Sequence, residues 1–62
     1  MRFREVEKVL RQNGYILVRK GKHYQYKNKD NPKLASVPYH KNVSDGVIDN
    51  LENGTGLSFK KR

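Results

Sequence analysis

The chain has 62 residues, no cysteine and a formal charge of +8, from 14 Lys and Arg residues against 6 Asp and Glu residues. This length allows one domain, residues 1–62, with a thin core, and the lack of cysteine excludes disulfides and thiolate metal sites. The dense positive charge predicts a polyanionic partner, which can be nucleic acid, an anionic membrane or an acidic protein.

Membrane insertion and secretion are not expected from this sequence. No apolar run approaches the ~20 residues that a membrane span needs. The first residues are not followed by the apolar core of a signal peptide. We therefore expect a cytoplasmic protein.

The first predicted element is a helix over Arg2–Asn13. Gly14 follows it, where a left-handed helix cap would lie. Apolar residues recur in this segment at helical spacing, with basic residues between them on the outer face, and they are Phe3, Val6, Val9 and Leu10.

Three short segments with strand character follow the helix. Tyr15–Arg19 is rich in β-branched and aromatic residues, and Lys20–Lys22 is a tight turn before a second strand over His23–Lys27. Asn28–Lys33 has turn composition throughout. Leu34–Val37 is the third predicted strand, closed by a proline.

The second strand alternates between apolar and polar side chains. Tyr24 and Tyr26 fall on one face, and His23, Gln25 and Lys27 fall on the other. We expect the two tyrosines to pack in the core and the opposite face to be open to solvent. That open face is where function is expected.

A second helix is predicted after the strands. Ser44 is a suitable N-cap, and Asp45 is favourable in the first turn. Gly54 and Gly56 are expected to end this helix early, and residues 60–62 are expected to fray. The side chains predicted to face the core are Val47, Ile48 and Leu51.

The order of elements is therefore α-β-β-β-α. Three consecutive strands with short connections make an antiparallel sheet, and its apolar face must be covered by the helices. The predicted class is α+β, with a three-stranded antiparallel sheet and both helices on one face.

His23 is the best candidate for chemistry. An exposed histidine titrates near pH ~6.5, so both of its protonation states are available near neutrality. A proton-transfer group would thus lie within a phosphate-binding surface, although a histidine in a solvated basic hairpin is the alternative. Basic residues surround His23 in the sequence, namely Arg19, Lys20, Lys22, Lys27, Lys29 and Lys33.

Other side chains are weaker candidates. His40 follows the third strand and is either a second acid or base or an ordinary loop histidine. Tyr15 and Tyr39 are candidates for stacking on an unpaired base. No His, Asp or Glu cluster has metal-ligand spacing, and no glycine-rich phosphate loop is present. We therefore expect neither a metal ion nor a small-molecule cofactor.

Several local strings, taken together in order, resemble the HicA toxin family from about Phe3 to Leu57. An amphipathic first helix precedes them, and each string alone is weak. They are Asn13-Gly14-Tyr15, Leu17-Val18-Arg19, Gly21-Lys22-His23, Val37-Pro38-Tyr39-His40, and Gly46-Val47-Ile48 with Leu51 and Gly56-Leu57.

The resemblance implies a fold like that of a double-stranded-RNA-binding domain. It also implies messenger-RNA cleavage that arrests growth until a HicB antitoxin binds. His23 matches the family's catalytic histidine and His40 a second family histidine, while Lys22 stands in place of the usual serine. The RNA contacts would then come from Arg19, Lys20, Lys22, Lys27, Lys29 and Lys41.

This resemblance leads to a hypothesis of a metal-independent endoribonuclease with His23 as general base. Two rival hypotheses use the same basic surface. One is a non-catalytic RNA- or DNA-binding module of the same fold, and the other is an interaction module for an acidic protein. Only the nuclease requires that the purified chain changes RNA covalently.

Overall fold

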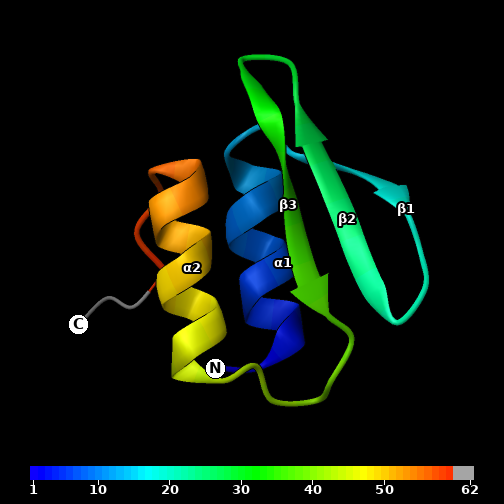
Figure 1. Cartoon of the computed structure of the whole chain (residues 1–62), viewed down its shortest axis with the longest axis vertical. Coiled ribbons are helices and arrows are strands. Elements are labelled where there is room, and N and C mark those ends of the chain that lie inside the picture. The colour runs from blue at the N-terminus through cyan, green and yellow to red at the C-terminus, as the bar shows by residue number, and fades with distance from the viewer. Residues whose placement is uncertain (60–62) are drawn as a thin grey trace.

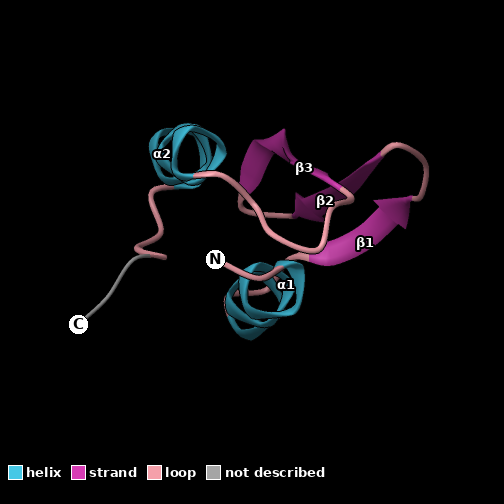
Figure 2. Ribbon diagram, turned by 90° about the horizontal axis from the view of Figure 1, so that it is seen from below, coloured by secondary structure: helices cyan, strands magenta, loops and turns pink. Residues whose placement is uncertain are grey.

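The computed structural model describes residues 1–59, which form two helices and three strands in the predicted order (Figure 1). The strands form an antiparallel sheet in the order β1-β2-β3. Both helices lie on one side of this sheet (Figure 2), so the predicted α+β fold is confirmed. The expected frayed tail, residues 60–62, lies outside the described residues. The elements are α1 (Phe3–Gln12), β1 (Ile16–Arg19), β2 (His23–Asn28), β3 (Asn31–Pro38) and α2 (Asp45–Thr55).

Helix α1 forms as its apolar spacing predicts. Val6 and Leu10 are fully buried, while the helix exposes Arg4, Lys8 and Arg11. The chain leaves the helix through Gly14, whose φ of +88° lies in the left-handed region that glycine adopts without strain. The predicted cap is therefore confirmed, and it turns the chain directly into β1.

The β2–β3 hairpin is longer than the sequence indicates. The segment Asn28–Lys33, predicted as a turn, contains a turn of only Lys29 and Asp30, and β3 starts at Asn31. Asn28 Oδ1 accepts a hydrogen bond from the Asp30 N–H at 2.8 Å, which closes the turn within two residues. Pro32 is tolerated within β3 because this strand lies at the sheet edge.

Helix α2 begins as predicted, and of the two glycines expected to end it only Gly56 does so. Ser44 Oγ accepts a hydrogen bond from the Val47 N–H at 3.4 Å. Gly54 lies inside the helix, and Gly56 ends it with a φ of +76° while its N–H donates to Glu52 O at 2.8 Å. The expectation that Gly54 ends the helix is wrong. A helical glycine costs only about 1 kcal/mol relative to alanine, and α2 is also held by its packing against β3.

The core lies between the sheet and the helices. Tyr26 is fully buried, as its alternation predicts, and Tyr24 is half-buried. Phe59, which follows α2, is also buried, and its N–H donates to Glu52 Oε2 at 2.9 Å. The buried set is Val6, Leu10, Tyr15, Tyr26, Ala35, Val37, Val43, Ile48, Leu51 and Phe59.

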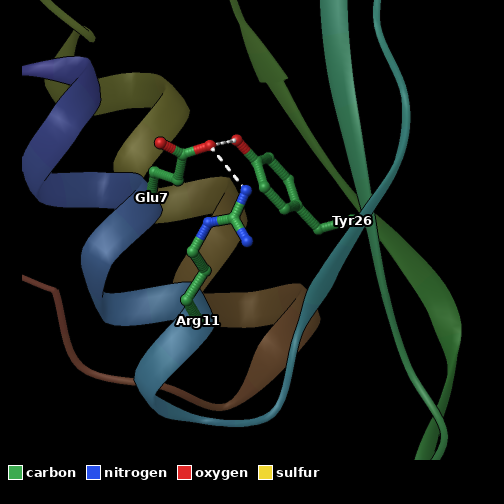
Figure 3. Close-up of polar contacts among 3 residues, drawn as sticks. All are labelled: Glu7, Arg11 and Tyr26. Atoms are coloured by element: carbon green, nitrogen blue, oxygen red, sulfur yellow. Dashed lines mark hydrogen bonds and ion pairs between the residues drawn. The ribbon is translucent and has the colours of Figure 1, made fainter.

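A polar contact links α1 to the buried face of the sheet (Figure 3). The Tyr26 hydroxyl donates to Glu7 Oε2 at 2.8 Å, and Arg11 approaches the same oxygen at 3.4 Å. Burial of the phenol raises the pKa of Tyr26 well above the ordinary tyrosine value, and the hydrogen bond to Glu7 raises it further. The neutral phenol is therefore the form that the fold stabilises.

This raised pKa predicts a loss of stability at alkaline pH. The folded chain keeps the phenol proton to higher pH than the unfolded chain, so the contribution of Tyr26 is complete below about pH 10 and falls above it. At pH 8 we expect Tyr26→Phe to lower the free energy of unfolding by about 1.5–3 kcal/mol, since it removes a hydrogen bond to a charged group. Between pH 10 and 12 this gap should narrow. Denaturant unfolding of the unmodified chain and of Tyr26→Phe from pH 8 to 12 measures this difference in the free energy of unfolding. A difference that stays constant with pH would contradict a raised pKa of Tyr26.

Candidate functional site

His23 is the first residue of β2 and is exposed to solvent. Its backbone partner on β3 is Pro38, and Gln25 likewise faces Ser36. Because paired residues share a face of the sheet, these four side chains lie on the face opposite Tyr24 and Tyr26. The predicted position of His23 on the outer face is therefore confirmed.

A groove of about 350 Å³ runs between the outer side of β3 and helix α2, and His23 lies at its border. Its polar side chains are Ser36, Asn50 and Thr55, and its apolar walls include Leu34 and Val47. Besides His23, the described lining holds no ionisable side chain. The groove thus combines a histidine with neutral hydrogen-bonding groups. Any permanent positive charge near His23 comes from residues outside the groove.

The nearest cations lie in the β1–β2 connection. Lys20 and Lys22 are exposed in this loop, and Lys22 directly precedes His23. A β-bulge between Leu17 and Arg19 places Arg19 opposite Gln25, which puts it on the outer face, about 7–8 Å from His23 by the usual diagonal Cα spacing. Arg19, Lys20 and Lys22 thus lie in or next to the connection that leads into His23.

Lys27 and Lys29 are exposed but lie toward the other end of β2. Lys27 is four residues from His23, which is roughly 13 Å along a strand. Both residues therefore lie further from His23 than Arg19 does.

His40 and Lys41 lie in a second pocket, of about 460 Å³. His23 does not line this pocket, so the structure does not bring the two histidines into one cavity. The pocket is held in shape by chain pairing: the Phe3 N–H donates to Lys41 O at 3.1 Å, and the Val43 N–H to Met1 O at 2.6 Å. Its lining consists of Arg2, Phe3, Arg4, Tyr39, His40 and Lys41.

Two aromatic rings, those of Phe3 and Tyr39, line this second pocket, and Tyr24 packs against both. Tyr24 and Tyr39 are stacked, with ring centroids 4.6 Å apart and planes 12° apart. Phe3 meets both rings edge-on, at 5.3 and 5.1 Å. Burial and the neighbouring Tyr39 raise the pKa of Tyr24. Tyr15, the other proposed stacking residue, is buried and its hydroxyl accepts a hydrogen bond from Asn31 Nδ2 at 3.0 Å, so that expectation is wrong.

Comparison with protein families gives a match over residues 3–57 to the family described as the HicA toxin of bacterial toxin-antitoxin systems. The chain belongs to the HicA toxin family. Searches of curated proteins and of solved structures give no match. Membership makes the chain the toxin of a toxin–antitoxin system, in which an antitoxin is its partner.

Two of the strings that carried the HicA resemblance lead into the two pockets. Gly21-Lys22-His23 leads into β2 at the first pocket, and Val37-Pro38-Tyr39-His40 leaves β3 into the second. The Tyr39 N–H donates to Lys22 O at 3.0 Å and so ties the two strings together. The resemblance and the geometry therefore mark the same end of the sheet.

Three polar groups near His23 in this HicA chain were not singled out in the sequence as site residues. Gln25 alternates with His23, so its place on the outer face was visible in the pattern. Ser36 and Asn50 gave no such signal, because their proximity to His23 depends on strand register and on where α2 packs.

Among residues 1–59 of the toxin, no three His, Asp or Glu side chains are grouped as metal ligands. Over the same residues, neither helix is long and apolar enough to span a membrane.

Proposed function

We propose that this HicA-family toxin is a metal-independent endoribonuclease that cleaves messenger RNA, with His23 as general base, and that a HicB-like antitoxin neutralises it. The observation that carries the proposal is the exposed His23 at the border of a groove, with Arg19, Lys20 and Lys22 around it, in a chain of the HicA family. A proton-transfer group and a local excess of cations are what RNA cleavage requires.

The reaction uses the nucleophile that RNA itself carries. Neutral His23 takes the proton of a ribose 2′-hydroxyl, and the 2′-oxygen attacks the adjacent phosphorus. General-base assistance of this kind contributes about 10²–10⁴ in rate. The bond from phosphorus to the 5′-oxygen then breaks, which leaves a 2′,3′-cyclic phosphate on one fragment and a 5′-hydroxyl on the other.

The surrounding cations supply the electrostatic part of the mechanism. Negative charge increases on the phosphorane as the 2′-oxygen attacks, and a nearby Lys22 or Arg19 stabilises it. The departing 5′-oxygen takes its proton from His40, from a loop lysine or from water. Lys27, further along β2, and Lys29, in the turn that follows it, add positive charge that holds the RNA.

The chemistry of the fragment ends tests this proposal. Purified toxin is incubated with labelled single-stranded RNA in EDTA, and the fragment ends are identified. Ends with 2′,3′-cyclic phosphate and 5′-hydroxyl are expected. Cleavage that EDTA abolishes would contradict the metal-independent scheme. Intact RNA together with a salt-sensitive gel shift would instead support a non-catalytic RNA-binding module.

A further inference from the structure

The second pocket differs chemically from the groove at His23. Its lining contains three side chains that carry a permanent charge at neutral pH, Arg2, Arg4 and Lys41, and no acidic side chain. None of the three forms an ion pair with another residue in the range 1–59. The local positive charge is therefore available to an anion.

An aromatic ring faces this positive charge. Tyr39 is 58% exposed although one of its faces lies on Tyr24. Phe3 is almost equally far from both tyrosine rings and perpendicular to them, so it stands beside the stack and does not cover the far face of Tyr39. Tyr24 does not line the pocket, whereas Tyr39 does. One face of Tyr39 is thus open next to Arg2, Arg4 and Lys41.

We propose that the pocket formed by Arg2, Arg4, Tyr39, His40 and Lys41 binds a single unpaired nucleotide, with its base stacked on Tyr39 and its phosphate held by the basic side chains. The proposal rests on the proposed ribonuclease function, because it gives the pocket the role of a subsite for a nucleotide that flanks the cleaved bond. An aromatic face with adjacent cations is the usual platform for single-stranded nucleic acid, and bases inside a duplex are not free to stack on it.

The position of the pocket fits a flanking nucleotide. Tyr39 directly follows Pro38, the strand partner of His23, so the Cα atoms of Tyr39 and His23 lie within about 10 Å. The two side chains serve opposite faces of the sheet, since Tyr39 covers Tyr24 and His23 faces outward. An RNA strand must therefore pass around the end of the sheet at Lys22, with its bases unpaired. The inferred substrate is single-stranded RNA, although the fold resembles a double-stranded-RNA-binding domain.

Fluorescence of 2-aminopurine tests the stacking. A 2′-O-methyl oligonucleotide that contains this base lacks the 2′-hydroxyl and cannot be cleaved, so binding is measured apart from chemistry. Its fluorescence should fall on binding to the toxin. Tyr39→Ala should remove this quenching and weaken binding about 5- to 150-fold, and Tyr39→Phe should retain both. Ile16→Ala, a truncation of an exposed apolar side chain remote from the pocket, is the matched control.

Two further variants, Tyr39→Leu and Arg4→Ala, test the stacking and the phosphate contact separately. Tyr39→Leu keeps an apolar side chain over Tyr24 but offers no aromatic face, so it should weaken binding like Tyr39→Ala even if the alanine variant is unstable. Arg4→Ala should reduce the slope of log affinity against log salt concentration by about 1, the value for one lost phosphate contact. Lys8→Ala, on the same helix, should reduce this slope less. Unchanged affinity in both Tyr39 variants, or duplex RNA that binds as tightly as single strands, would overturn the subsite.

The nuclease and the subsite can fail separately. Quenching that depends on Tyr39, without any cleavage of ordinary RNA, would support the subsite and reject the nuclease. Cleavage that neither Tyr39→Ala nor Tyr39→Leu affects, together with unquenched fluorescence, would support the nuclease and reject the subsite.

Discussion

Replacing His23 with alanine is expected to reduce RNA cleavage by about 10²–10⁴-fold, the usual contribution of a general base. Affinity for RNA should change little, because the cations at the site remain in place. The fold should also persist, since His23 is exposed and its strand pairing with Pro38 uses only backbone groups. Substitutions at such surface positions usually alter stability by less than about 0.5 kcal/mol.

Single-turnover cleavage of one labelled RNA measures this effect, with a gel shift for affinity and a thermal melt for folding. His23→Gln should be as inactive as His23→Ala, since an amide keeps hydrogen bonding but cannot take the proton. Lys8→Ala, which removes a charge from the exposed side of α1, is the control for charge alone. Full activity in His23→Ala together with loss in His40→Ala would move the general base to His40.

Replacing Leu10 with alanine is expected to have the largest effect on stability. Leu10 is fully buried in α1, and its carbonyl accepts hydrogen bonds from the Asn13 and Tyr15 N–H groups where the chain leaves the helix. Truncation of a buried leucine costs about 2–5 kcal/mol. A chain of this length has a total stability of only roughly 3–9 kcal/mol, so much of the variant should be unfolded at 37 °C.

Thermal unfolding followed by circular dichroism checks this expectation. The midpoint should fall by roughly 10–40 °C, given about 4–8 °C per kcal/mol for a domain of this size. Ile16→Ala, which truncates a side chain that is 61% exposed, should leave the midpoint close to that of the unmodified chain. A Leu10→Ala midpoint as high as that of Ile16→Ala would show that the core tolerates the cavity. Cleavage by Leu10→Ala should decrease with the folded fraction, whereas His23→Ala should lose activity while folded.

Local sequence patterns determined most of the fold. Helical spacing of Phe3, Val6 and Leu10 defined α1, and the cap at Gly14 followed from the glycine itself. Strict alternation in β2 put Tyr26 in the core and His23 outside. These features depend on residues a few positions apart, whose geometry in a helix or strand is fixed by the backbone period.

Element boundaries were less predictable, because contacts distant in sequence decide them. Turn residues over 28–33 indicated a long loop, yet Asn28 and Asn31 hydrogen-bond to Asn13 and Gly54 in the chain at the ends of both helices and so extend the hairpin. Gly54 was expected to stop α2, but packing against β3 carries the helix through it to Gly56. Local propensity is weaker than these tertiary contacts.

Some features of the candidate site also follow from local sequence, whereas others depend on contacts distant in sequence. The sequence by itself determined that His23 is exposed among cations, since alternation and composition are local properties. Only the tertiary structure placed Arg19 beside it through a β-bulge and separated His40 into a pocket with Tyr39. Register, bulges and helix packing set which side chains share a cavity, and these depend on the whole chain folding around one core.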